Sequence, residues 1–300
     1  MMFCASCGTA EVDDIKLKDC SACKLVKYCN VQCQKDHRPQ HKRACKKRAA
    51  ELRDEILFKQ HESTHLGDCP ICCLPLQYDN DKSTMMSCCC KTICNGCEYA
   101  NRMREFEGKL KHTCPFCRHP LPNLEEEIRK NYIIIQEEAD KNYMKRIEAN
   151  DPVAFFEMGL RRRDEGDIEG FFKYMTKAAE LGDAGAHYVL SVMYHEGKGI
   201  EKDEKKEMHH LEEAAIAGNP DARYNLGCVE GKSGRYERAM KHFIVSANMG
   251  HNKSLDALKE GFMAGVVSKD EFAAALRGHQ AAIDATKSPQ RDVASAALKK

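Results

Sequence analysis

Apolar residues recur at helical spacing along most of the second half of the chain. Over residues 121–150 they fall on one face of a predicted connector helix. Asp151 followed by Pro152 predicts its end, because the residue before a proline disfavours helical geometry. A further helix is predicted over residues 42–58. No apolar run reaches the roughly 18 residues that a membrane-spanning helix needs, so the sequence predicts no membrane segment.

The segment over residues 151–286 repeats itself. Two small residues followed by a glycine recur in Ala178-Ala179-x2-Gly182, Ala214-Ala215-x2-Gly218 and Ser246-Ala247-x2-Gly250, at intervals of 36 and 32 residues. This period, with two helices per unit, predicts an α-solenoid in which each repeat buries its apolar face against the next. About three units fall within residues 152–250. Residues 254–286 are expected to form capping helices, and residues 287–300 a disordered tail.

The repeat resembles the Sel1-like repeats, which are relatives of the tetratricopeptide repeat. The loop Gly197-Lys198-Gly199-Ile200 and the following Asp203-Glu204-Lys205-Lys206 fit the pattern best. The resemblance implies a repeat surface that holds protein partners. One segment, residues 227–233, looks like a phosphate-binding loop but has three residues between its glycines where that motif needs four. We therefore assign it to a repeat helix.

The first 117 residues hold 17 of the 18 cysteines, which indicates a different kind of domain from the helical second half. The N-terminus has no basic segment followed by an apolar core, so no secretory signal is expected. The protein is then expected inside the cell, in the cytoplasm or nucleus, where cysteines stay reduced. Cysteine pairs at short fixed spacing in a reducing compartment are more often metal ligands than disulfides.

Four ligand pairs occupy residues 4–45. They are Cys4-x2-Cys7, Cys20-x2-Cys23, Cys29-x3-Cys33 and His41-x3-Cys45. Tetrahedral zinc takes four nitrogen or sulfur ligands, so eight ligands predict two Zn²⁺ ions. The spacing by itself does not assign the pairs to the two sites.

This segment resembles the MYND-type zinc finger, which shares Tyr28-Cys29-x3-Cys33-Gln34 and His41-Lys42-x2-Cys45. The interleaved arrangement of that family implies one ion on Cys4, Cys7, Cys29 and Cys33, and a second ion on Cys20, Cys23, His41 and Cys45. Related fingers bind short proline-containing peptides. Near that surface the family usually has a tryptophan where this chain has Arg38.

A second cysteine module follows. Its cysteines are Cys69, Cys72, Cys88, Cys89, Cys90, Cys94, Cys97, Cys114 and Cys117. The segments Cys-Pro-Ile-Cys and Cys-Pro-Phe-Cys-Arg resemble the ends of a RING-type finger. Its cross-brace topology implies a third ion on Cys69, Cys72, Cys94 and Cys97, and a fourth on Cys114, Cys117 and two of the triplet 88–90. The resemblance favours Cys88 and Cys89, whereas spacing equally allows Cys88 and Cys90.

The RING resemblance also implies a contact surface for an E2 ubiquitin-conjugating enzyme. Ile71, Pro115 and Arg118 stand at the matching positions. Ile71 and Pro115 could equally be core and turn residues of a small zinc fold. The tryptophan that many RING fingers place on this surface is absent, with Phe106 as the candidate substitute.

The sequence thus predicts a mainly α-helical protein with two small interleaved zinc-binding modules, four Zn²⁺ ions and an α-solenoid. The expected modules are the MYND-type finger (1–48), a helix and linker (49–68), the RING-like finger (69–120), the connector helix (121–150), the solenoid with its capping helices (151–286) and the tail (287–300). Their order resembles a multi-module family of diatoms and similar microalgae.

Three functions compete at this stage. The leading hypothesis is a protein-interaction adaptor that recruits an E2 enzyme through the RING-like finger while the MYND finger and repeats hold partners. The alternative is an active RING-type E3 ubiquitin ligase, which would carry no covalent catalytic residue of its own. A third hypothesis is nucleic-acid binding through the basic residues 42–48. This is the weakest of the three, because the run lacks interleaved aromatic residues and the formal charge is only +1.

Overall fold

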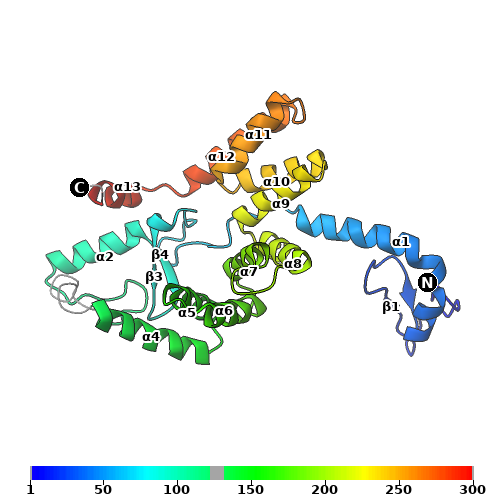
Figure 1. Ribbon diagram of the computed structural model, residues 1–300, viewed down its shortest axis with the longest axis horizontal. Helices are drawn as coiled ribbons and strands as arrows, with labels where there is room; N and C mark the ends of the chain where they lie inside the picture. The colour runs from blue at the N-terminus through cyan, green and yellow to red at the C-terminus, as the bar shows by residue number, and fades with distance from the viewer. Residues whose placement is uncertain (1, 122–131, 299–300) are drawn as a thin grey trace. The chain divides into compact units, whose positions relative to one another are not determined.

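The computed structural model describes residues 2–121 and 132–298 (Figure 1). The chain divides between Lys59 and Gln60 into two compact units. The expected boundary at residue 48 falls inside a helix that continues to Leu57, so the first unit is longer than the finger alone.

The first unit joins a two-stranded hairpin to one long helix. Strands β1 (Lys18–Asp19) and β2 (Lys27–Tyr28) pair antiparallel, and helix α1 spans Val31–Leu57. The helix begins earlier than predicted because the Asn30 side chain accepts a hydrogen bond from the Cys33 backbone N–H at 2.8 Å. Leu17, Tyr28 and cysteine side chains make up its small core. Such a core is too small to stabilise a fold without metal or another cross-link.

The second unit begins with the second cysteine module, residues 69–120. A 3₁₀ turn η1 (Asn80–Lys82) leads into the antiparallel strands β3 (Ser83–Met86) and β4 (Lys91–Cys94), with Ser83 opposite Cys94. Helix α2 (Asn95–Glu107) follows directly. Leu76, Met86 and Ile93 pack among the buried cysteines. The module therefore has a slightly larger apolar core than the first finger.

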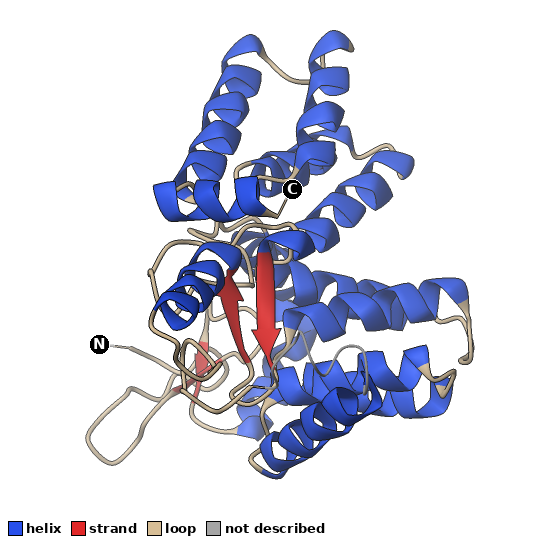
Figure 2. Cartoon of the chain, turned by 90° about the vertical axis from the view of Figure 1, so that its left-hand side faces the viewer, coloured by secondary structure: helices blue, strands red, loops and turns tan. Residues whose placement is uncertain are grey.

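The other regular elements that the structure describes in this unit are helices (Figure 2). Their bounds are α4 (Tyr132–Glu148), α5 (Pro152–Asp164), α6 (Ile168–Glu180), α7 (Ala184–Glu196), α8 (Glu204–Ile216), α9 (Pro220–Lys232), α10 (Tyr236–Ala247), α11 (Asn252–Met263), α12 (Lys269–Ala285) and α13 (Pro289–Ala297). Aspartate or asparagine side chains cap the first five repeat helices by accepting backbone N–H groups. The part of the predicted connector helix over residues 122–131, with its proposed cap Asn123, lies outside the described residues.

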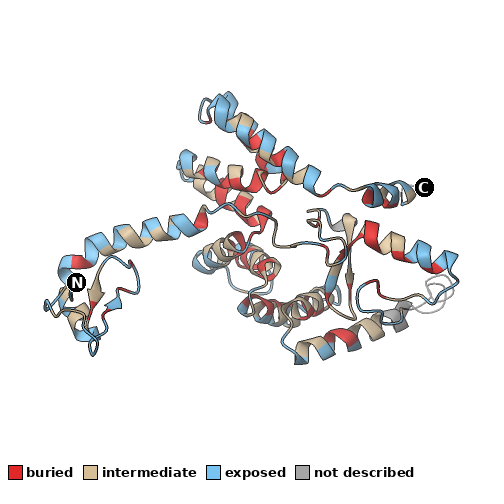
Figure 3. Ribbon diagram, turned by 180° about the vertical axis from the view of Figure 1, so that it is seen from behind, coloured by how far each residue is buried: buried red, intermediate tan, exposed pale blue. Residues whose placement is uncertain are grey.

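The paired helices confirm the predicted solenoid. Helices α5 and α6, α7 and α8, and α9 and α10 pack as antiparallel pairs, and each pair also contacts the next. Buried residues line the faces between helices (Figure 3). Ala178, Ala214 and Ser246 are fully buried there, as expected for small residues at close helix contacts.

Two sequence expectations about the second half have different outcomes. Residues 227–233 lie mainly in α9, so the phosphate-loop likeness belongs to a repeat helix, as the sequence analysis concludes. The expectation of a disordered tail over residues 287–300 is wrong for residues 289–297, which form α13. Ser288 caps this helix and Pro289 starts it, and it packs against α2. Within the described ranges, no helix has both the length and the apolar character needed to cross a bilayer.

Candidate metal centres

Sixteen ligand atoms gather into four separate groups. Cluster 1 is Cys4, Cys7, Cys29 and Cys33; cluster 2 is Cys20, Cys23, His41 and Cys45; cluster 3 is Cys69, Cys72, Cys94 and Cys97; cluster 4 is Cys88, Cys89, Cys114 and Cys117. Within each group the ligand atoms lie within 4.8 Å of one another. Each group takes its two ligand pairs from separated segments of the chain, so both modules are interleaved.

The spacing of these atoms fits tetrahedral zinc. Thiolates bound at about 2.3 Å around a tetrahedral ion lie about 3.8 Å apart. Neighbouring ligand sulfurs are separated by 3.4 Å between Cys88 and Cys117 and by 3.9 Å between Cys89 and Cys114. All 18 cysteines are free thiols, so none of these contacts is a disulfide. Each cluster could hold one zinc ion with all four positions filled by protein, which is typical of a structural site.

The thiols of cluster 1 illustrate why a cation suits these sites. The Cys29 thiol donates a hydrogen bond to Sγ of Cys33 at 3.5 Å and also contacts Sγ of Cys7, and these contacts hold its proton and raise the pKa of Cys29 to about 12. Burial raises the pKa of Cys45, in cluster 2, to about 11. Several thiolates therefore cannot coexist at one site without a positive ion. Zinc supplies that charge and displaces the protons, so binding stabilises the fold.

Beside cluster 2, a second histidine, His37, contacts the ligand His41, a contact that was not predicted from the sequence. The Nε2 atom of His41 lies 3.1 Å from Sγ of Cys23. His37 stacks on His41 with ring centroids 5.6 Å apart, and its Nδ1 atom hydrogen-bonds to the Tyr28 hydroxyl at 3.0 Å. These contacts fix the orientation of the ligand ring. The spacing of four residues between His37 and His41, on one helix face, is the signal that could have found this contact.

The structure separates the three consecutive cysteines of the second module. Cys88 and Cys89 lie with the last cysteine pair in cluster 4. Cys90 is buried instead against Tyr143, Ala154 and Met158 of helices α4 and α5. Burial raises the pKa of the Cys90 thiol to about 11, so it stays neutral in this apolar environment. Cys90 thus joins the module to the helical part of the unit.

The residues expected to contact an E2 enzyme differ in exposure. Ile71 is 41% exposed, Pro115 is buried and Arg118 is exposed. The Arg118 guanidinium donates a hydrogen bond from Nη1 to Oδ1 of Asn101 at 2.9 Å. Phe106, the candidate substitute for the missing tryptophan, is 81% exposed.

A buried carboxylate supports the last ligand pair. Glu105 on α2 is only 4% exposed and accepts hydrogen bonds from the Thr113 backbone and hydroxyl at 3.1 and 2.7 Å. His112 and Asn101 also contact this carboxylate, both at 2.9 Å. Burial opposes the charged form, yet these hydrogen bonds outweigh it and lower the pKa of Glu105. The chain just before Cys114 is thereby fixed to α2, which a sequence pattern does not reveal.

A groove of about 420 Å³ opens beside cluster 2 on the first finger. Ala22 and Val31 contribute exposed apolar surface, and Val31 is 67% exposed, whereas Tyr28 lies almost fully buried beneath the groove. Four basic residues of α1 also line it: Lys35, Arg38, Lys42 and Lys46. None of these four forms an ion pair within the described part of the chain. The groove therefore combines an apolar surface with four basic side chains, beside the cluster 2 ligands Cys20, His41 and Cys45.

Comparison with known proteins identifies two of the modules. The MYND finger family matches residues 4–45, and the Sel1 repeat family matches residues 172–183, 184–219 and 220–251. The chain thus contains a MYND finger and Sel1 repeats.

Individual relatives match only parts of the chain. Chitin synthase regulatory factor 4 of Schizosaccharomyces pombe is 30% identical over 86 residues, which is 28% of this chain and 14% of that protein. Among solved structures, a Sel1 repeat protein from Oxalobacter formigenes has a TM-score of 0.43 at 20% identity, covering 61% of this chain and 71% of that one. The protective antigen c5321 of uropathogenic Escherichia coli has a TM-score of 0.40 at 19% identity, covering 47% and 32%.

Proposed function

We propose that this protein is a zinc-stabilised adaptor whose MYND finger captures short acidic peptide segments of partner proteins. A zinc-binding MYND finger combined with Sel1 repeats fits a protein-interaction adaptor. Clusters 1 and 2 would hold structural zinc and keep the groove in shape. The Sel1 repeats would provide a second surface for partner proteins.

The observation that carries this proposal is the charge of the groove. Lys35, Arg38, Lys42 and Lys46 recur three or four positions apart, so they share one face of α1. They border the exposed apolar surface of Ala22 and Val31. A peptide with an apolar residue flanked by aspartate or glutamate would satisfy both features. Arg38 replaces the tryptophan usual in related fingers, which favours a carboxylate over a proline ring at that position.

Fluorescence anisotropy with labelled peptides tests the proposal. We expect the full-length zinc-loaded protein to prefer acidic-apolar peptides over the same peptides with Asp→Asn and Glu→Gln changes, with affinity falling as salt rises. Combined Arg38→Ala and Lys42→Ala should weaken binding about tenfold, while Lys47→Ala, an exposed change outside the groove, should not. Equal binding of acidic and amidated peptides would rule out this role.

Nucleic-acid binding through residues 42–48 receives less support. Consecutive residues of a helix point in different directions, so the basic run does not form one surface. Arg48 is already paired with Glu51 at 3.2 Å and with Glu55 at 2.8 Å. Binding of DNA or RNA more tightly than acidic peptide in the same assay would reverse this preference.

A second candidate function is recruitment of an E2 enzyme by the second cysteine module, in the manner of a RING-type finger. The exposed Ile71 between the first two ligands of cluster 3 favours it, as does the exposed Arg118 after the last ligand of cluster 4. The buried Pro115 could support the loop rather than contact the enzyme.

Autoubiquitination with a panel of E2 enzymes tests this candidate. Ubiquitin chains that are lost in Ile71→Ala would support an active ligase. E2 binding without chains, also lost in Ile71→Ala, would support an adaptor role alone. Ile56→Ala removes another exposed isoleucine, on α1, and serves as the control. If no E2 enzyme binds and none forms ubiquitin chains, both the ligase role and the E2-recruiting adaptor role are excluded.

A further inference from the structure

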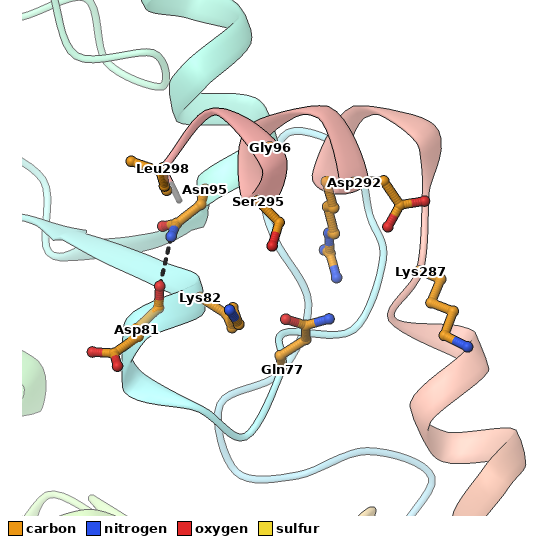
Figure 4. Close-up of a pocket in the computed structure, with 10 residues that line it drawn as sticks. Gln77, Asp81, Lys82, Asn95, Gly96, Lys287, Asp292, Ser295 and Leu298 are labelled. Carbon is orange, nitrogen blue, oxygen red and sulfur yellow. Dashed lines mark hydrogen bonds between the residues drawn. The ribbon is translucent and has the colours of Figure 1, made fainter. Parts of the chain in front are cut away.

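The C-terminal helix α13 lies against the second cysteine module although residues 121–288 separate them in sequence. It packs along α2, and Gln77 of the module donates a hydrogen bond to the Thr286 hydroxyl, just before the helix, at 3.1 Å. Figure 4 shows residues of α13, including Asp292 and Ser295, next to Asn95 and Gly96 at the start of α2. The docked helix leaves only a small cavity of about 270 Å³.

Arg291 makes the central contact of this interface. The residue is 8% exposed, and its guanidinium reaches the loop that follows the first ligand pair of cluster 3. Nη1 donates to the Pro75 carbonyl at 2.7 Å and to the Thr286 carbonyl at 2.8 Å. Nη2 donates to the Leu74 carbonyl at 3.1 Å and lies 3.5 Å from Sγ of Cys72. The same cation therefore holds the backbone beside a metal ligand and the ligand sulfur itself.

Gly96 permits this approach. A Cβ atom at that position would lie 2.9 Å from Cγ of Arg291 and 3.0 Å from its Cα and N atoms. Real Cβ atoms essentially never show the 2.9 Å contact, and the two backbone contacts at 3.0 Å are tighter than nine in ten real Cβ contacts. Glycine between the ligands Cys94 and Cys97 therefore lets α13 lie closer to α2 than any larger residue would without a shift of Arg291.

When cluster 3 holds zinc, its net negative charge strengthens its contact with the Arg291 guanidinium. Four thiolates around one Zn²⁺ ion carry a net charge of −2, whereas protonated thiols carry none. An N–H donor to a ligand sulfur stabilises the charged, metal-bound form, and such outer contacts typically change metal affinity 10–100-fold. Binding of metal at cluster 3 and docking of Arg291 should therefore strengthen each other by the same factor, because coupling free energies are reciprocal.

We propose that Arg291 is an outer-sphere ligand of cluster 3 that couples zinc binding at this cluster to docking of the C-terminal helix. The zinc-loaded cluster holds α13 against α2. Loss of that one ion weakens the hold, so α13 and the residues before it become accessible while the solenoid stays folded. The coupling makes the C-terminal segment responsive to the free zinc concentration.

Zinc titration of the full-length protein tests the coupling. In buffers of decreasing free zinc, alkylation of cysteines followed by peptide mass spectrometry gives a release midpoint for each cluster. We expect Arg291→Met to raise the free zinc concentration needed by cluster 3 about tenfold, with clusters 1 and 2 unchanged. Arg277→Met, an exposed arginine on α12, is the matched control. An unchanged midpoint for cluster 3 would overturn the proposal.

Two further measurements separate coupling from general destabilisation. Gly96→Ala retains the arginine but displaces it, so it should weaken cluster 3 in the same direction as Arg291→Met. In the unmodified protein, hydrogen exchange over residues 289–297 should rise at the free zinc concentration that empties cluster 3. Exchange in α13 that does not change at that midpoint would show that the helix docks independently of the metal.

Discussion

The Tyr78 hydroxyl donates a hydrogen bond to Oδ2 of Asp221, across 143 positions of sequence. The other oxygen of the same carboxylate lies 3.0 Å from Nε2 of His251. Burial raises the pKa of Tyr78, so the hydroxyl stays protonated and remains a donor. These three side chains fasten the second cysteine module to the repeat helices α9 and α11.

Removal of the Tyr78 hydroxyl tests this fastening. Tyr78→Phe leaves one carboxylate oxygen without its donor, and we expect the free energy of unfolding of the second unit to fall by about 1–2 kcal/mol. Chemical denaturation gives the value. Tyr236→Phe removes an exposed hydroxyl and should change stability by less than about 0.5 kcal/mol. Equal effects of the two changes would contradict a role for this contact.

The cysteine triplet offers a sharp test of metal assignment. Native mass spectrometry should find four zinc ions in the unmodified protein. Cys89→Ala should lose one ion, because cluster 4 would retain only three ligands. Cys90→Ala should keep all four ions and lose about 1 kcal/mol of stability from its apolar contacts. Loss of an ion from Cys90→Ala alone would show that the triplet is wrongly assigned.

Chelation should separate the metal-dependent modules from the solenoid. Excess chelator at neutral pH should abolish the tertiary structure of the MYND finger, because its core consists largely of ligand side chains. The repeats have apolar cores of their own, so most of the helical circular dichroism signal should persist. A complete loss of helical signal would mean that the solenoid depends on zinc.

Two glycines of α9 distinguish close packing from open space. A Cβ atom on Gly227 would lie 2.5 Å from Cε1 of Phe243, so Gly227→Ala should cost about 1–3 kcal/mol in unfolding free energy. A Cβ atom on Gly231 meets only the Ala239 methyl at 3.8 Å, and Gly231→Ala should stabilise by up to about 1 kcal/mol. Thermal unfolding of both variants measures the two changes in stability. If residues 227–231 formed a loop rather than a helix, the order of the two changes would be reversed.

A histidine pair predicts how repeat stability depends on pH. His210 contacts Nδ1 of His187 through its own Nδ1 at 3.0 Å and stacks on Tyr194. Burial, followed by the nearby charges of His187, His209 and Lys206, lowers the pKa of His210 to about 4. The folded protein therefore keeps this ring neutral, while the unfolded chain binds a proton below about pH 6.5.

Stability should consequently be fully present above about pH 6.5 and fall as the pH drops from 6.5 towards 4. Because the ring is only partly buried, the loss amounts to roughly 1–2 kcal/mol, or a few degrees in Tm. His210→Gln should flatten this part of the profile of Tm against pH. His195→Gln, which changes an exposed histidine paired with Glu207, should leave the profile as it is.

Local patterns in the sequence determined much of this protein. Cysteine pairs with two or three residues between them place their sulfurs on one turn, so most ligand residues follow from spacing, although spacing left Cys89 and Cys90 as alternatives. The MYND and RING resemblances indicated which pairs combine. The 32–36-residue period fixed the solenoid, since each repeat must bury its face against a neighbour. Asp151 and Pro152 marked a helix boundary because capping and proline geometry act within a few residues.

Only the tertiary structure decided how the modules of the second unit join. It placed Cys90 against Tyr143 rather than in a cluster, brought Arg291 to Cys72, and turned an expected tail into a docked helix. These outcomes depend on which surfaces meet across as many as 219 positions of sequence. No local spacing carries that information, because a buried arginine or cysteine is favourable only when distant groups supply its partners.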